Sequence, residues 1–438
     1  MREKIRVVVF SRWAPWIIFF LSLITRLIGA YLGGNRNDDS DQVYVRMAVH
    51  FLSGQGFSLV GGEFGRVYSW LPPGMGFLNV IFYSLFGQNE LIIRAIFVVM
   101  SALANVSLFC LAKRLLKVEY AFLAALVWAI YPPQWFWASR INPHTYATNI
   151  MIFSIHLLFF SWERKSYWMG MAVGLLWATA SLCRGEYALG FLVLAGATLI
   201  RRETSSFVVI PAKAGIQAGN LLLKGRSETW IPAFAGMTGI LMATSIIFGW
   251  ALGFAPWVAR NYSIHHRFVL IATNDGDNFW KAYNPAYQFR GEDIPFPPEL
   301  LGRLRQEPNE VGRADILKRE AFRFIRENPG RAIRNVTGNL LNFWRPWLSR
   351  TAVSAFENGL YLASYVPLLV LFVLGLFKVP WRDPHWRVVV GLLVYKWVIH
   401  GPFYVIVQFR ESVMPLMALV AVLFIQWYFQ KGENSSHA

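Results

Sequence analysis

The first residues that could do chemistry form an acidic cluster, Asp38 to Asp41, after the first long apolar stretch. Tyr44 and Ala48 continue a helical apolar pattern behind it, so the cluster stands at the start of a short amphipathic helix. A carboxylate at the rim of a membrane can act as a general base or bind a divalent cation. Aspartate at a helix start can equally cap free amides and suit the helix dipole. The spacing alone leaves both interpretations open.

Further ionisable groups lie between later apolar stretches. Arg66 stands in the first loop, where a guanidinium could pair with the oxygens of a lipid phosphate or could simply be solvated. His144 lies at one predicted outer turn, and Arg184 lies with Glu186 at the next. Because ionisable groups near membrane depth line cavities or pair with one another, His144 and Arg184 are candidates for substrate contacts. An interfacial histidine without a task and a structural Arg184 to Glu186 ion pair are the alternatives.

Residues 256 to 285 bring aromatic and polar side chains into one segment. The run FVLI at 268 to 271 predicts a short strand, and the polar residues that follow predict a turn. Asn274 and Asp275 lie in that turn, and Trp280 follows it closely. An aromatic face beside amide and carboxylate groups suits a sugar ring, which shows CH groups on one face and hydroxyls at its edge. These three residues are therefore candidates for sugar contacts.

The composition places these groups on a membrane protein. Of 438 residues, 55% are hydrophobic and 15% are charged, whereas soluble domains are about 25% charged. The net charge of +17 would suggest a nucleic-acid partner in a soluble chain, but here much of the excess lies between apolar spans. With only Cys110 and Cys183, the chain has neither a disulfide framework nor a zinc-type cysteine pattern. These features predict an integral membrane protein without a nucleic-acid partner.

Apolar runs long enough to cross a bilayer predict an all-α polytopic protein with about ten to twelve transmembrane helices. The predicted spans are roughly 13 to 32, 91 to 112, 119 to 138, 145 to 162, 167 to 183, 186 to 200, 238 to 258, 359 to 377, 387 to 408 and 411 to 429. The basic start lacks a cleavage site and predicts a retained first span. A shorter apolar run, 75 to 87, is expected to lie beside the membrane.

The short loops set the predicted orientation, because lysine and arginine collect on the cytoplasmic side. Both termini are then cytoplasmic, and residues 33 to 90 and 259 to 358 lie outside. Residues 1 to 258 form an N-terminal transmembrane module that includes the first loop, and residues 359 to 438 form a C-terminal one. The segment between them is predicted to be a mixed α/β extracytoplasmic unit. Any chemistry is expected on the outer side.

Residues 203 to 237 do not fit the predicted pattern of apolar spans and short loops. Residues 208 to 215 read VIPAKAGI and residues 231 to 238 read IPAFAGMT, a near repeat of small residues around proline and glycine. The repeat is similar to the translated form of a palindromic DNA element dispersed in bacterial genomes. An ordinary loop is the alternative. Residues 203 to 237 are therefore predicted to be a cytoplasmic insertion without a catalytic role.

The order of these segments resembles the GT-C membrane glycosyltransferases. The acidic cluster and Tyr44 are followed by LSGQGFS, LPPGMGFLNVIFYSLFG, PWVARNY, TNDGDNFW and REAFRFIRENPGRAIRNVTGNLLNFWRPW, and a last outer turn follows at Arg410 to Pro415. More narrowly, the chain is similar to the bacterial branch akin to protein mannosyltransferases and the aminoarabinose transferase of lipid A. The resemblance covers most of the chain except residues 203 to 237, and it rests on the order of the segments.

The resemblance implies an inverting transfer of a sugar from a polyprenyl-phosphate donor to an acceptor glycan, lipid or protein. The transfer would occur at the outer face of the bacterial inner membrane. Asp41, with Asp39 as second choice, would be the general base or would hold a divalent Mg²⁺ or Mn²⁺ ion. Arg66, Arg260 and Arg410 would stabilise the departing phosphate. The substrates would contact Tyr44, Asn274, Asp275, Trp280, Arg184 and His144.

The chain departs from the family pattern at two places. Some relatives carry an acidic and a basic residue directly before the two prolines, where this chain has Trp70 and Leu71, so Glu63 is the nearby substitute as a metal ligand. Many members have Pro-Glu at the third outer turn, where this chain has Pro143 and His144. A transporter or flippase of a lipid-linked sugar, or an inactive scaffold relative, remains the alternative. Paired broken helices, which such a transporter would need, are not evident in the sequence.

Overall fold

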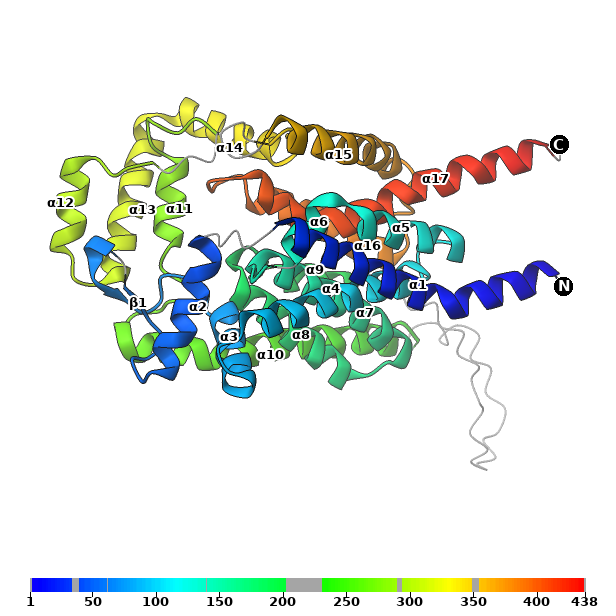
Figure 1. The fold of residues 1–438 in the computed structure, drawn as a ribbon, viewed down its shortest axis with the longest axis horizontal. Coiled ribbons are helices and arrows are strands. Elements are labelled where there is room, and N and C mark those ends of the chain that lie inside the picture. The colour runs from blue at the N-terminus through cyan, green and yellow to red at the C-terminus, as the bar shows by residue number, and fades with distance from the viewer. Residues whose placement is uncertain are drawn as a thin grey trace, which may run out of the picture.

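The computed structural model describes residues 2–33, 39–60, 62–138, 140–201, 231–289, 294–348 and 354–436. Side chains are described for these residues except at 2–11, 33, 39–41, 231–237, 407 and 433–436. Long helices run side by side, and both termini lie at one end of the molecule (Figure 1). The opposite end, which we call the distal end, holds α2, β1 and α11 to α13 (Figure 1).

The helices of the bundle follow the apolar runs. They are α1 (Arg2–Gly33), α4 (Glu90–Ala112), α5 (Val118–Ile130), α6 (Pro132–Ala138), α7 (Pro143–Arg164), α8 (Tyr167–Cys183), η2 (Gly185–Tyr187), α9 (Phe191–Ile200), α10 (Ile231–His265), α15 (Ala355–Leu376), α16 (Pro384–Ile399), η3 (Val407–Val413) and α17 (Met414–Ser436).

Shorter elements build the distal part. They are α2 (Asp39–Leu52), β1 (Leu59–Val60), η1 (Gly62–Phe64), β2 (Arg66–Val67), α3 (Gly74–Phe86), α11 (Asp275–Ala282), α12 (Pro298–Gln306), α13 (Glu310–Glu327) and α14 (Pro329–Phe343). Strands β1 and β2 pair antiparallel, with Leu59 opposite Val67. They belong to the first long loop of the sequence.

The chain is a polytopic helical membrane protein. Among the described residues, five helical stretches are long and apolar enough to span a bilayer: Arg12–Leu32, Glu90–Ala112, Thr238–His265, Ala355–Leu376 and Gln408–Gly432. Further apolar helices are shorter: Gly74–Phe86, Val118–Ile130, Tyr167–Cys183 and Gly185–Ile200. A polytopic membrane fold is thus confirmed, and the count of ten to twelve spans stays a prediction.

Two predicted spans are wrong as continuous helices. The span expected at 119 to 138 ends at Ile130, and a separate helix starts at Pro132, because proline cannot donate the backbone hydrogen bond that would continue a helix. The span expected at 387 to 408 ends at Ile399, before Gly401 and Pro402. Phe403 and Tyr404, which follow the second break, line the larger of the two cavities described below.

Helices α8 and α10 pack in close contact through glycine. A Cβ atom at Gly174 of α8 would overlap the carbonyl oxygen of Ile246 and would lie 2.6 Å from the Trp250 backbone nitrogen. A Cβ at Gly249 of α10 would likewise overlap the Met171 carbonyl. Small residues at helix interfaces in membranes let two backbones approach, where dispersion forces between them are strongest.

The strand predicted at 268 to 271 is wrong. The structure has no strand there, and the described residues of 259 to 358 form helices and irregular chain, so the mixed α/β character expected for this segment is not seen in them. The backbone of this stretch is held by a side chain, because Asn261 donates to the Val269 carbonyl at 3.0 Å. The turn predicted at Asn274 is the start of helix α11.

A buried polar network joins the first loop to the segment after α10. The Glu310 carboxylate accepts backbone N–H bonds from Tyr68 at 3.1 Å and Ser69 at 2.7 Å. His265 Nε2 lies 3.0 Å from both Ser69 Oγ and Glu310 Oε1. A catalytic triad uses both ring nitrogens of its histidine, one toward each partner. Since one nitrogen meets both partners here, the network is structural.

The C-terminal end of the predicted insertion overlaps a helix. Helix α10 begins at Ile231, so residues 231 to 237 belong to the backbone of a helix that continues into the bundle. Residues 203 to 230 lie outside the described residues.

Candidate active site

Two cavities meet beneath helix α2. The smaller cavity has a volume of about 630 Å³ and the larger one about 890 Å³. Four residues line both of them: Tyr44, Leu71, Arg184 and Phe409. We call these four residues the junction. Ligand sites in proteins have volumes of about 300 to 1,000 Å³, so each cavity can hold one substrate headgroup.

Helix α2 and the turn before α3 position two of the junction residues. Tyr44, Met47 and Ala48 are buried along one side of α2, as their helical spacing predicts, and α2 packs on α3. Leu71 precedes Pro72 and Pro73, after which α3 starts at Gly74. The apolar spacing of α2 thus places Tyr44 against the cavities. The tight approach of Gly74 to Cys183 of α8 holds the turn in place.

Three guanidinium groups line the smaller cavity. They belong to Arg46 of α2, Arg184 and Arg313 of α13, and His144 and Asn142 line the same space. Arg313 donates to the carbonyls of Glu307 at 2.8 Å and Pro308 at 3.2 Å. Burial lowers the pKa of Arg313, against the opposing charges of Glu310 and Glu307. A cavity with several arginines favours a phosphate, because guanidinium donors pair with phosphate oxygens.

The junction is also the centre of a charge cluster. Arg184 donates to Glu186 Oε2 at 2.9 Å, so the predicted ion pair is present, and Arg184 lines both cavities as well. Glu186 Oε1 accepts a 2.9 Å bond from Lys396 and lies 3.8 Å from His144 Nδ1. Phe409 packs against the His144 ring, with centroids 5.3 Å apart.

The larger cavity has an apolar wall and a charged rim. Residues 268 to 272 supply the wall, and Asn274 and Asp275 line the rim, as predicted from the sequence. Asp275 pairs with Lys318 at 2.7 Å. The combination suits a ligand with both an apolar part and hydroxyl groups.

Trp280 and Glu63 have other surroundings than the sequence predicted. Trp280 is 4% exposed and packs on Phe296, with ring centroids 4.9 Å apart, in a small core under α13. Glu63 pairs with Arg305 at 2.9 Å, and both side chains are 55% exposed. In the described part of the chain, no group of three histidine, cysteine or acidic residues could hold a metal ion. Trp280 is thus a core residue, and Glu63 is half of a surface ion pair.

The three arginines predicted to hold the donor phosphate bind protein groups instead. Arg66 bonds to Gln55 and Ser58, and Arg260 donates to the carbonyls of Phe57 at 2.7 Å and Tyr68 at 2.8 Å. Buried Arg410 donates to the carbonyls of Phe343 and Arg345, at 3.2 and 2.7 Å. None of the three is among the described residues that line the two cavities. Their contacts are with protein groups, and a role in binding the donor phosphate stays a prediction.

Replacing Arg260 by methionine is expected to lower stability, because the Phe57 and Tyr68 carbonyls would lose their donor. Phe57 is 4% exposed, and a buried unsatisfied group costs about 1 to 3 kcal/mol, so the melting temperature in detergent should fall. Arg66→Met is the matched control, since Arg66 is exposed and its partner Gln55, which is also exposed, can bond to water instead. Equal melting temperatures for the two variants would contradict the structural role of Arg260.

The two predicted catalytic carboxylates can be placed only by their backbone. Asp39 and Asp41 belong to the first turn of α2, as the sequence predicted, and their side chains lie outside the described part of the structure. Asp41 precedes Tyr44 by three residues. Residues three apart in a helix share a face, so the backbone of α2 places Asp41 on the same face as Tyr44, which lines both cavities.

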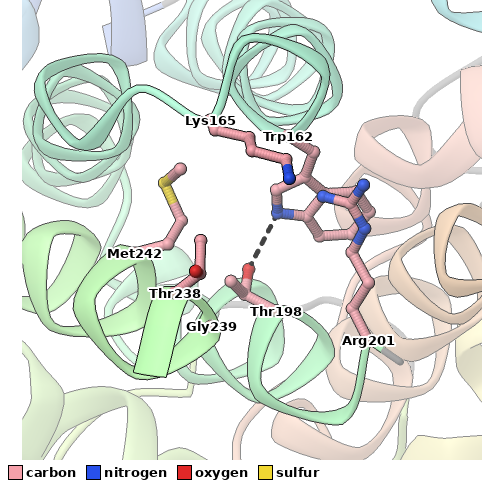
Figure 2. A pocket seen from close by; sticks show the side chains of 7 residues that line it. All are labelled: Trp162, Lys165, Thr198, Arg201, Thr238, Gly239 and Met242. Atoms are coloured by element: carbon pink, nitrogen blue, oxygen red, sulfur yellow. Dashed lines mark hydrogen bonds between the residues drawn. The ribbon is translucent and has the colours of Figure 1, made fainter. Parts of the chain in front are cut away.

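A third cavity is too small for a substrate. Figure 2 shows the side chains of Trp162, Lys165, Thr198, Arg201, Thr238, Gly239 and Met242 around it, with Trp162 bonded to Thr198 at 3.1 Å. Its volume of about 20 Å³ holds about one water molecule. This cavity is therefore set aside, and we place the candidate active site at the pair of cavities that share the junction.

Sequence reasoning missed several of these residues. Arg46 and Arg313 carry no motif, because their approach depends on how α2 and α13 fold over the bundle. Lys396 carried a usable signal, since it is an ionisable residue within an apolar run.

Comparisons with known proteins came from three sources. Residues 71–217 match the family model described as dolichyl-phosphate-mannose-protein mannosyltransferase. A search of curated proteins found no match to the chain. Among solved structures, the oligosaccharyltransferase of Archaeoglobus fulgidus, tethered to an acceptor peptide with an NVT sequon, has a TM-score of 0.57 at 11% identity. The alignment covers 96% of this chain and 50% of that one.

A second structure of the archaeal oligosaccharyltransferase AglB from Archaeoglobus fulgidus contains an inhibitory peptide and a dolichol-phosphate. Its TM-score is 0.57 at 10% identity, over 96% of this chain and 51% of that one. A third, in complex with Zn and sulfate, has a TM-score of 0.55 at 12% identity, over 95% of this chain and 49% of that one. This chain thus spans about half the length of these structures and shares their fold.

Proposed function

We propose that this chain, whose resemblance to the GT-C membrane glycosyltransferases is confirmed by its fold and its family match, transfers a sugar between two substrates at its distal end. The donor is a polyprenyl-phosphate-linked sugar, and the acceptor is a glycan, a lipid or a protein. In this proposal the distal end faces the periplasm from a bacterial inner membrane, and both termini are cytoplasmic. The matched family is named for a dolichyl-phosphate donor, which supports a lipid-phosphate donor here.

The meeting of two cavities at Arg184 is the observation that carries the proposal. An inverting transfer is a single displacement, so donor and acceptor must be bound at the same time on opposite sides of the anomeric carbon. Two cavities that share a boundary satisfy this condition, and one cavity of either size alone would not. The anomeric carbon would stand at the junction.

The donor phosphate belongs to the smaller cavity, near Arg46, Arg184 and Arg313. These guanidinium groups would stabilise the negative charge that develops as the phosphate leaves. Arg66, Arg260 and Arg410 are not among the described residues that line the two cavities, which makes them weaker candidates for this task. The structure of AglB with a dolichol-phosphate supports the same class of ligand for this fold.

Asp41 is our candidate for the general base, with Asp39 as second choice. The acceptor hydroxyl would attack the anomeric carbon while its proton passes to the carboxylate, and the bond from that carbon to the phosphate oxygen would break. Among the described side chains, Glu63 is paired with Arg305 and no group of three possible metal ligands is found. A divalent ion at Asp41, whose side chain is not described, stays a prediction. We therefore assign no step to a metal ion.

A transfer assay tests this function. The purified chain in proteoliposomes would receive a polyprenyl-phosphate sugar labelled in the sugar, together with an envelope extract as acceptor. We expect the label to leave the lipid and to appear on an acceptor. Label that crosses the bilayer while it stays on the lipid would support a flippase and reject the transferase. Label that does neither would indicate an inactive scaffold.

A further inference from the structure

Lys396 is a buried cation close to the candidate site. It belongs to α16, and its side chain is 1% exposed. It is not among the described residues that line the two cavities. Its ammonium group donates to Glu186 Oε1 at 2.9 Å and lies 3.9 Å from the Tyr187 ring centroid. A charge in such a place is costly unless it is paired, so its role must pass through Glu186.

Glu186 joins this buried cation to Arg184, which is partly buried at the junction. Its two oxygens are divided, with Oε1 bonded to Lys396 and Oε2 to Arg184 at 2.9 Å. The three side chains together carry two positive charges and one negative charge. His144 lies 3.8 Å from the Glu186 carboxylate, His400 lies against the Lys396 carbonyl, and both histidines are buried. Arg184, Glu186 and Lys396, which we call the charged triad, thus have a net charge of one positive unit.

We propose that Lys396 is a positioning residue that keeps Arg184 able to bind a phosphate. Without Lys396, Arg184 and Glu186 would form a neutral pair, and an incoming phosphate would have to compete with the carboxylate for the guanidinium. With Lys396 present, the carboxylate charge is shared between two cations, and the junction attracts an anion. Charges act strongly on one another here, because burial lowers the effective dielectric constant. The identity of the anion as a donor phosphate rests on the proposed function.

A purely structural role for Lys396 is the competing explanation, since its bond to Glu186 also joins α16 to η2. The two roles differ in what restores binding. Lys396→Met makes the triad neutral, whereas the double variant Lys396→Met with Glu186→Gln returns it to one positive charge without the ion pair. Tyr395→Phe is the structural control. It removes the hydrogen bond from the Tyr395 hydroxyl to the Glu186 carbonyl, 2.9 Å long, and the one from the Leu189 N–H to that hydroxyl, 3.1 Å long. The charge is unchanged.

The experiment measures binding of farnesyl phosphate to the full chain in lipid nanodiscs, with farnesol as the uncharged reference. We expect Lys396→Met to weaken farnesyl phosphate binding by about tenfold or more and to leave farnesol binding unchanged. The double variant should return to within about threefold of the wild type, and Tyr395→Phe should bind like the wild type. Thermal unfolding of every variant shows whether it is folded.

Three results would overturn the inference. These are unchanged binding in Lys396→Met, a loss that the double variant does not recover, and a loss of equal size in Tyr395→Phe. Farnesyl phosphate that binds the wild type no better than farnesol would reject both the inference and the phosphate site of the proposed function. If binding follows the expected pattern while the labelled sugar is never transferred, the inference stands and the transferase proposal fails.

Discussion

Replacing Asp41 by asparagine is expected to lower the rate of sugar transfer by about 100- to 10,000-fold, the usual contribution of a general base. Asparagine has nearly the shape of aspartate but cannot accept the acceptor proton. Because the phosphate site lies on other residues, farnesyl phosphate should bind the variant as tightly as it binds the wild type. Initial rates of label transfer in proteoliposomes give the comparison.

The same substitution separates catalysis from helix capping. Asparagine and aspartate cap helices about equally well, and the lost attraction to the helix dipole is worth only about 0.3 to 1 kcal/mol. A purely structural carboxylate would therefore give a slightly lower melting temperature and normal transfer. Asp39→Asn, in the same turn of α2, tests the second choice for the base. Undiminished transfer in both variants would reject the assigned base.

Replacing Gly174 by alanine is expected to disrupt the packing of α8 against α10. The new methyl group would overlap the Ile246 carbonyl oxygen and would lie 3.0 Å from the Gly249 carbonyl carbon. Both contacts are with backbone, which cannot rotate away, so the helices must separate. Overpacking of this kind costs about 1 to 3 kcal/mol, and the melting temperature in detergent should fall accordingly.

Gly196 of α9 provides the control for that substitution. A Cβ atom there would meet nothing within 4 Å, so alanine fits without a shift. Since alanine favours a helix over glycine by about 1 kcal/mol, Gly196→Ala should be neutral or slightly stabilising. A Gly174→Ala variant that melts no lower than Gly196→Ala would show that α8 and α10 can separate without loss.

The sequence predicted the membrane class and many of the helices, because apolar runs of bilayer length are a local property. The helical spacing of Tyr44 and Ala48 predicted α2, and the two prolines predicted the break before α3. The sequence also identified Arg184, Asn274 and Asp275 as candidates for substrate contacts, and all three line the larger cavity. The GT-C resemblance rested on the order of such segments, which the sequence contains directly.

The tertiary structure decided which arginines are available to a substrate. Arg66, Arg260 and Arg410 looked suitable by type and position, yet backbone carbonyls occupy Arg260 and Arg410. Arg260 reaches Phe57, 203 positions away, so no local pattern could reveal that contact.

The positive charge at the junction also depends on a contact between residues that are far apart in the chain. Lys396 and Glu186 are 210 positions apart in the chain and come together only because α16 packs beside η2. The sequence determined which segments enter the membrane and which residue types stand at their ends, since hydropathy acts over neighbouring residues. Folding decided which of those side chains are consumed by the protein's own carbonyls and which are left facing a cavity, because that depends on contacts between distant segments.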